Sequence, residues 1–329
     1  MMSVHGIHRR LAAALLALGI GSILPVAQAQ APAPAKPVRI IVPATAGSAA
    51  DLVARLLGER IAKSGAQSWV IENRPGAGGT IGADVVAKAM PDGGTLLFTA
   101  NNFIIAPRLY PSIPYDIHKD FTAIGPVAVG HDMIFVNPSL NVKSLKELAV
   151  LAKRTSGGLN YGAPFYGSSA HLIMEALGRA SGMELTFIAA SGGPQSFGEA
   201  VAGRVPVVIG SAFAGEGFVK AGRLNAIAAV GAKRSVFLPQ VPTLSEEGHA
   251  ALNLPLWFGV YGPARLPAPI AAQVARDMAR VVGSAEFADA LVSRGFTPAP
   301  GTAADLLAMM RDGEPVFARA IAEAGIKPQ

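Results

Sequence analysis

Two stretches of small and hydroxyl-bearing residues are the parts of this sequence best suited to bind an anion. They cover residues 43–48 and 161–171, and each lies between an apolar strand-type run and a helix-type segment. At such a junction the backbone N–H groups of the first helical turn and the helix dipole attract negative charge. The pattern therefore predicts a two-loop clamp for a carboxylate. An ordinary turn stays open as the alternative, in which Gly47 only permits the backbone conformation and Ser48 only caps a helix.

Side chains within these loops differ in how directly they indicate binding. Gly167 and Ser168 are small enough to let a ligand approach the backbone amides. His171 could donate a hydrogen bond to a ligand, or it could pack in the first helical turn without touching one. Phe165 and Trp257 carry a similar alternative, because a large aromatic side chain can line a cleft or fill a core.

Catalytic and metal-binding patterns are missing from the sequence. It contains no cysteine and no Gly-x-Ser-x-Gly elbow, and the histidines at 118, 131, 171 and 249 lack the spacing of a helical metal site. Residues 76–82 approach a dinucleotide fingerprint, but Ile81 stands where its third glycine is needed. The sequence therefore predicts a binding protein with no cofactor, no metal and no enzymatic activity.

The segments that must position these loops alternate between short β-branched runs and runs of helical period. We expect strands at 38–42, 69–72, 95–99, 133–136, 159–163, 185–188, 205–209 and 224–230. Ser48, Ser144 and Thr302 are each followed three residues later by an acid, which is the pattern of a capping box at a helix start. This alternation predicts a parallel α/β architecture, and 329 residues suffice for two lobes with separate cores.

The first 29 residues have the composition of a cleavable signal peptide. Basic residues at 8–10 precede an apolar run at 11–24, and Ala27-Gln28-Ala29 supplies the small residues of a cleavage site. The apolar run contains glycines and ends at Pro25, so it is shorter than the ~20 residues of a membrane span. We expect export by the Sec or twin-arginine route, cleavage after about Ala29 and a periplasmic location.

Composition argues against two further classes of protein. The net charge is +6 with scattered Lys and Arg, and aromatic residues amount to 6%, which does not support a nucleic-acid surface. No later apolar run reaches the length of a membrane span, and without cysteine there is no lipid anchor at the cleavage site. We expect neither nucleic-acid binding nor a direct membrane anchor.

Several sequence phrases together resemble the Bug receptors of tripartite tricarboxylate transporters. They lie at 38–43, 72–79, 91–93, 114–116, 136–138, 233–235, 239–243 and 257–259, so the likeness spans nearly the whole chain after the signal peptide. The resemblance implies a type II periplasmic-binding-protein fold, in which two Rossmann-like α/β lobes hold a carboxylate in the cleft between them. It also implies that the glycines at 76–79 are structural.

Carried over position by position, the resemblance places binding residues in both clamp loops, at the end of the third strand and on the second lobe. This sequence departs from the family where Gly47-Ser48 replaces paired glycines and Ala190-Ser191-Gly192 replaces Tyr-Lys-Gly. Ser211 stands near a position that is commonly acidic in the family, so an unusual ligand is expected. The predicted ligand-binding residues are Ala44, Ala46, Gly47, Ser48, Asp51, Asn101, Phe165, Gly167, Ser168, Ser169, His171, Ser191, Gly192 and Ser211.

These observations favour a monomeric receptor that binds a small organic carboxylate and delivers it to the membrane permease subunits of a tripartite transporter. Residues 30–133 and 257–329 are expected to form the first lobe and residues 134–256 the second, with hinges near 134 and 257. Three alternatives stay open at this point: an orphan sensor, a hydrolase or isomerase on the same fold, and a structural or adhesive protein.

Overall fold

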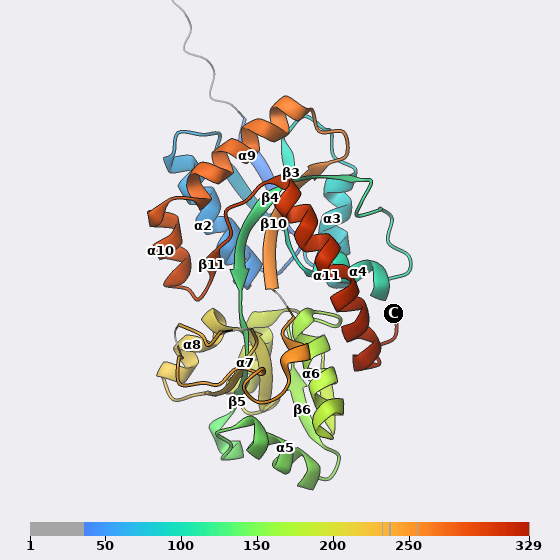
Figure 1. The fold of residues 1–329 in the computed structure, drawn as a ribbon, viewed down its shortest axis with the longest axis vertical. Helices are drawn as coiled ribbons and strands as arrows, with labels where there is room; N and C mark the ends of the chain where they lie inside the picture. Colours follow the sequence, from blue (N-terminus) through green and yellow to red (C-terminus); the bar gives the residue numbers. More distant parts are fainter. Residues whose placement is uncertain (1–35, 232, 237, 255, 329) are drawn as a thin grey trace, which may run out of the picture. The chain divides into compact units, whose positions relative to one another are not determined.

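The chain forms two mixed β-sheets, each flanked by helices (Figure 1). The computed structural model describes residues 36–231, 233–236, 238–254 and 256–328. The predicted signal peptide, residues 1–29, and the segment that follows it to residue 35 lie outside the described residues. Among the helices in these ranges, none combines the length and the apolar composition needed to cross a membrane.

The first lobe is built on a sheet whose strands come from both ends of the described chain. The predicted strands at 38–42, 69–72 and 95–99 are present to within one residue. The helices of this lobe are α2 (Ala49–Lys63), α3 (Thr80–Ala87), α4 (Asn102–Leu109), α9 (Ala268–Val282), α10 (Ala285–Val292) and α11 (Ala303–Ala324). Helix α11 also packs against helix α6 (Ser169–Ser181) of the second lobe. The strand order is β11 (Thr297–Pro298), β4 (Phe121–Gly130), β10 (Leu256–Pro263), β3 (Thr95–Ala100), β1 (Val38–Val42) and β2 (Trp69–Asn73).

The second lobe is built from the middle of the chain. Its helices are α5 (Leu145–Arg154), α6 (Ser169–Ser181), α7 (Gly193–Val201) and α8 (Ala212–Lys220). The strand order is β7 (Leu185–Ile188), β6 (Leu159–Gly162), β8 (Val207–Ser211), β5 (Asp132–Val136) and β9 (Asn225–Ala229). The strand expected at 205–209 therefore lies two residues further along the chain.

The prediction of a parallel architecture is right for the βα units and wrong for the strands at the crossings between the lobes. β1 is parallel to β2 and β3, and β6 is parallel to β7 and β8. In contrast, β10 is antiparallel to β3 and β4, and β5 is antiparallel to β8 and β9. A strand arriving from the other lobe enters the sheet from the opposite end, and a residue pattern carries no information on that direction.

Strand β1 shows why the first sheet needs helices on both faces. Val38, Ile40 and Val42 are buried in the cluster that includes residues of α2 and α9, whereas Ile41 belongs to the cluster on the opposite face. Side chains alternate along a strand, so a strand with buried apolar side chains on both faces must be covered on both sides. The cluster around Ile41 continues into the second lobe at Ile134, so the two lobes share part of one core.

Polar caps begin the helices where the sequence predicts them. The Ser48 hydroxyl accepts a hydrogen bond from the backbone N–H of Asp51 at 3.3 Å, which starts α2. A reciprocal capping box forms at α11, where Thr302 and Asp305 bond to each other's backbone N–H. In α2, by contrast, the carboxylate of Asp51 accepts from the backbone N–H of Gly47, the residue before the N-cap Ser48. This difference ties the loop before α2 to the helix.

Candidate ligand-binding site

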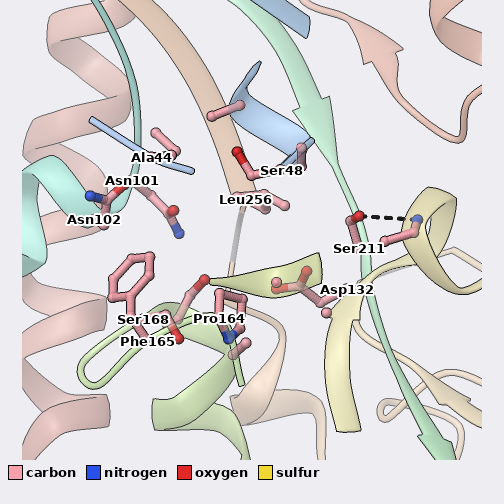
Figure 2. Close-up of a pocket in the computed structure, with 18 of the residues that line it drawn as sticks. Ala44, Ser48, Asn101, Asn102, Asp132, Pro164, Phe165, Ser168, Ser211 and Leu256 are labelled. Atoms are coloured by element: carbon pink, nitrogen blue, oxygen red, sulfur yellow. Dashed lines mark hydrogen bonds between the residues drawn. The ribbon is translucent and has the colours of Figure 1, made fainter. Parts of the chain in front are cut away.

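A cavity of about 110 Å³ lies at the carboxyl ends of β1, β3, β6 and β8, where α2, α4, α6 and α8 begin. β1 and β3 are neighbours whose following helices pack on opposite faces of the sheet, and the same is true of β6 and β8. Open α/β sheets bind ligands at such switch points. Figure 2 shows side chains of both lobes around the cavity; its polar lining consists of Ser48, Thr99, Asn101, Asn102, Asp132, Ser168, Ser169 and Ser211.

The first loop, residues 43–48, is held in place by the carboxylate of Asp51. Gly47 N–H donates to Asp51 Oδ2 and Asn73 Nδ2 donates to Oδ1, both at 2.9 Å. Asn73 Nδ2 also donates to the carbonyl of Ala44 at 3.1 Å. Burial raises the pKa of Asp51, but bonds from Arg55, Gly47 and Asn73 outweigh it and leave the pKa below its usual value. Asp51 is therefore ionised at neutral pH and supports the loop from outside the cavity lining.

The second loop is held in place by His171, which is buried in the first turn of α6. Gly167 N–H donates to His171 Nδ1 at 3.0 Å, and the Ser168 hydroxyl accepts from the backbone N–H of His171 at 3.2 Å. Because Nδ1 accepts, the neutral ring carries its proton on Nε2. Burial lowers the pKa of His171 to about 4, so the ring is neutral at pH 7. His171 positions this loop in the way that Asp51 positions the other.

Each loop is followed by a helix whose first residues line the cavity. Ala49 and Ala50 begin α2, Ser169 and Ala170 begin α6, and all of them line the cavity. The backbone N–H groups of these residues have no acceptor within their own helix, and the helix dipole adds partial positive charge. The described lining contains no Lys, Arg or His. The groups that can bind a carboxylate here are therefore backbone amides and hydroxyls.

Asp132, the first residue of β5, contributes the acidic group of the described lining. Its residue exposure is 6%, and burial raises its pKa to about 7. Asp132 was not predicted as a site residue, because a single aspartate at a strand start carries no motif. Its place in the cavity lining follows only from the sheet, in which β5 pairs with β8.

The rest of the lining is apolar. Trp257, for which the sequence left open a place in the cleft or in the core, is 1% exposed and lies in the core. Its strand neighbours point into the cavity because side chains alternate along β10. The large apolar residues of the lining are Pro164, Phe165, Phe197, Leu256 and Phe258.

The lobes approach each other at glycines beside the cavity. A Cβ atom on Gly192 would lie 2.2 Å from Oγ1 of Thr45, which belongs to the first loop. A Cβ atom on Gly167 would lie 2.3 Å from Cδ1 of Leu109, at the end of α4. Gly167 also has a φ of +78°, a conformation that favours glycine. These glycines allow the two lobes to come into close contact beside the cavity.

The structure brings many of the predicted residues to this one cavity and places others beside it. Ala44, Gly47, Ser48, Asn101, Phe165, Ser168, Ser169 and Ser211 line the cavity. Ala46, Asp51, Gly167, His171, Ser191 and Gly192 are outside its lining. The N–H and hydroxyl of Ser191 both bond to Oε1 of Gln195 at 2.7 Å, so this serine is engaged within its own loop and helix.

Several lining residues were not predicted from the sequence. Asn102 directly follows the predicted Asn101 at the end of β3, so the same reasoning about strand ends could have found it. Pro194 and Phe197 lie on α7, a helix that was not predicted either. In the described ranges, no group of three or more His, Asp or Glu side chains is arranged to hold a metal ion.

Two α/β lobes with a cavity at the carboxyl ends of their strands are the architecture of two-lobed solute-binding proteins such as BugD. The chain belongs to the tripartite tricarboxylate transporter family receptors, whose family description matches residues 53–326. The resemblance to Bug receptors is thereby confirmed.

Individual relatives agree with this assignment over most of the chain. BugT of Bordetella pertussis is 30% identical over 296 residues, which cover 89% of this chain and 91% of BugT. The structure of the periplasmic binding protein BugD is 27% identical with a TM-score of 0.84, and the match covers 90% of this chain and 100% of BugD. An R. palustris protein solved with adipate is 30% identical with a TM-score of 0.86, and the match covers 90% and 99% of the two chains.

Proposed function

We propose that this protein is an exported receptor that captures a small carboxylate between its lobes and delivers it to the permease subunits of a tripartite transporter. The observation that supports this most is that α2 and α6, from different lobes, line one cavity with their first turns. A carboxylate can accept hydrogen bonds at both oxygens and so link the two loops. The adipate in the R. palustris relative belongs to the same ligand class.

The size of the cavity favours a ligand with few heavy atoms. Its volume of about 110 Å³ is modest. An engineered protein cavity of ~150 Å³ admits benzene. A short organic acid therefore fits the cavity in the form that this structure describes.

In this proposal the lobes move about the crossings between the sheets. One crossing lies at His131, between β4 and β5, and the other lies at the entry to β10. A few residues at the ends of strands can absorb such a rotation while the sheets stay rigid. Closure would bring the first turns of α2 and α6 onto the same ligand, and the permease would bind the closed form.

We also propose that the N-terminal segment directs export and is removed. BugD, which is similar to this chain, is described as a periplasmic binding protein. Cell fractionation of the full chain, followed by N-terminal sequencing of the exported form, tests this. A mature N-terminus near residue 30 in the periplasmic fraction supports the proposal, and retention of the full chain in the cytoplasm contradicts it.

A thermal-shift screen of the mature protein against short carboxylates tests the receptor function. A ligand at 100 times its Kd adds about 2.7 kcal/mol to the free energy of unfolding, which is readily detected. Ser168→Asp should abolish the shift, because it places a carboxylate where the ligand's own carboxylate binds while still capping α6.

Ser284→Asp is the matched control for that variant. Ser284 caps α10 as Ser168 caps α6, with a hydroxyl that accepts from the N–H of Phe287 at 3.3 Å, and it is outside the cavity lining. Ligand shifts should survive in Ser284→Asp. If no short carboxylate stabilises the wild type, or if Ser168→Asp responds as the control does, the proposed function is wrong.

A further inference from the structure

The carboxyl group of Asp132 faces the ligand cavity without a partner among the described residues. No described residue donates a hydrogen bond to it, and burial is the sole cause of its raised pKa. Figure 2 shows the carboxyl group between Pro164 and Ser211, turned toward the space between the drawn side chains. The hydroxyl of Ser211 accepts from the N–H of Ala214, on the side of α8.

No residue of the described cavity lining carries a positive charge that could pair with Asp132. The described cavity lining contributed by α2, α4, α6, α7 and β10 contains no charged or titratable side chain. The adjacent His131 lies near Gly231, since a Cβ there would be 2.7 Å from Nδ1, and burial lowers the pKa of His131. This histidine is therefore a neutral neighbour near pH 7. A positive charge that pairs with Asp132 must come from the ligand.

A buried acid without a partner is unfavourable, and such groups gather at binding sites where the ligand completes the pair. A protonated amine on the ligand would donate to Asp132 and supply the opposite charge. A second carboxylate on the ligand would instead bring a like charge into a cavity whose described lining holds no cation. The two ligand classes are therefore discriminated by the same side chain.

We infer that Asp132 selects, within the carboxylate class, ligands that also carry a protonated amine. The ligand's carboxylate binds the first turns of α2 and α6, and its ammonium group pairs with the Asp132 carboxylate. This inference rests on the proposed function, because it takes the anion site at the two helix N-termini as given. It departs from the relative solved with adipate, whose ligand has a carboxylate at both ends.

Isothermal titration with matched ligands tests this inference. 3-Aminopropionate, butyrate and succinate share one carboxylate and two methylenes, and they differ only in a terminal ammonium, methyl or carboxylate group. The sets with one methylene (glycine, propionate, malonate) and three methylenes (4-aminobutyrate, pentanoate, glutarate) cover the unknown distance between the two ends. At pH 8 the amine should bind about tenfold more tightly than the methyl ligand in the best-fitting set, and the dicarboxylate should bind about tenfold more weakly.

Asp132→Asn should remove both differences, leaving the three ligands of a set within about threefold of each other. Asp132→Ser repeats the test with a smaller side chain. Asp289→Asn, on the exposed face of α10, makes the same change in net charge away from the cavity and should keep the wild-type order.

The outcomes separate this inference from the proposed function. If butyrate or succinate binds and the amine has no advantage in any set, the inference is overturned while the receptor function stands. If a dicarboxylate binds best, binds more tightly as the pH falls and tolerates Asp132→Asn, then a protonated Asp132 serves as a donor and the inference is also wrong. If no ligand binds, both proposals fail together.

Discussion

Gly167 donates its backbone N–H to Nδ1 of His171 at 3.0 Å, and this bond joins the second loop to the helix that follows it. Through this bond, Gly167 and His171 can affect ligand binding although both are outside the cavity lining. Gly167 has a positive φ and closely approaches Leu109 of the first lobe, while His171 is buried behind the loop. Residues 167–171 therefore combine three features: a backbone conformation that favours glycine, a close contact with the first lobe, and a buried side chain that supports the loop.

His171→Ala should weaken carboxylate binding, because it leaves the N–H of Gly167 without its acceptor. We expect about tenfold weaker binding and a loss of about 1–3 kcal/mol in unfolding free energy, the usual cost of an unsatisfied buried donor. His171→Asn should restore much of both, since its amide oxygen can replace Nδ1 as the acceptor. Calorimetry and denaturant unfolding measure the two effects. Equal losses in the Ala and Asn variants would show that packing, and not this bond, is the important contribution.

The stability of the protein should depend on pH through two buried groups with opposite effects. The folded pKa of His171 is lowered to about 4 from 6.5, so its contribution to stability is lost as the pH falls from about 6.5 to 4. The folded pKa of Asp132 is raised to about 7 from 3.8, so its contribution is lost as the pH rises through this range. Each effect should partly cancel the other in the wild type.

Single variants should separate these two effects. Asp132→Asn should become more stable relative to wild type as the pH rises from 4 to 8, because it removes the unfavourable ionisation of a buried carboxyl group. His171→Asn should lose the acid-side decline that histidine causes. Urea unfolding at several pH values measures both curves. A constant difference between wild type and Asp132→Asn across this pH range would contradict the raised pKa.

Asp51→Asn should loosen the first loop without changing any atom in the cavity lining. The two carboxylate oxygens of Asp51 accept hydrogen bonds from Gly47, Arg55 and Asn73, and asparagine replaces one of these oxygens with an amide nitrogen. The substitution also removes the negative charge that pairs with Arg55. We expect a loss of about 1–2 kcal/mol in unfolding free energy at pH 7. Because the folded pKa of Asp51 is lowered, this difference should shrink as the pH falls below about 4. Unfolding curves at pH 7 and pH 3 measure it.

Gly192→Ala should oppose the approach of the lobes. The added Cβ would lie 2.2 Å from Oγ1 of Thr45, so the closed arrangement becomes less favourable. We expect about tenfold weaker ligand binding with little change in stability, because the contact is between lobes and not within one. Gly198→Ala on α7 is the control, since a Cβ there has no atom within 4 Å. At a ligand concentration that saturates the wild type, small-angle scattering should show a more open form of Gly192→Ala. Unchanged binding would mean that Thr45 rotates away at no cost.

Patterns within short stretches of sequence predicted the regular elements well. The strands β1, β2, β3 and β7 and the capped starts of α2, α5 and α11 follow from alternation, apolar composition and side-chain oxygens at N-caps. The clamp loops were found for the same reason, because a loop between a strand and a capped helix is a local feature. Helices α4, α7, α8 and α10 and strands β4 and β11 were not predicted. Helices α4, α7 and α8 are short and contain Pro107 or glycines, so packing rather than local propensity holds them.

The sequence by itself determined the two-lobed α/β class and the loops that supply backbone donors, because both depend on residues that are near each other in the chain. Only the tertiary structure decided which of these residues face the cavity. It placed Asp51 and His171 outside the cavity lining, where they support the two loops. It placed Asp132, the first residue of the antiparallel strand β5, in the cavity lining. The physical reason is that exposure to a shared cavity depends on strand order and direction, which combine segments far apart in sequence. The meeting of Thr45 with Gly192 is decided in the same way.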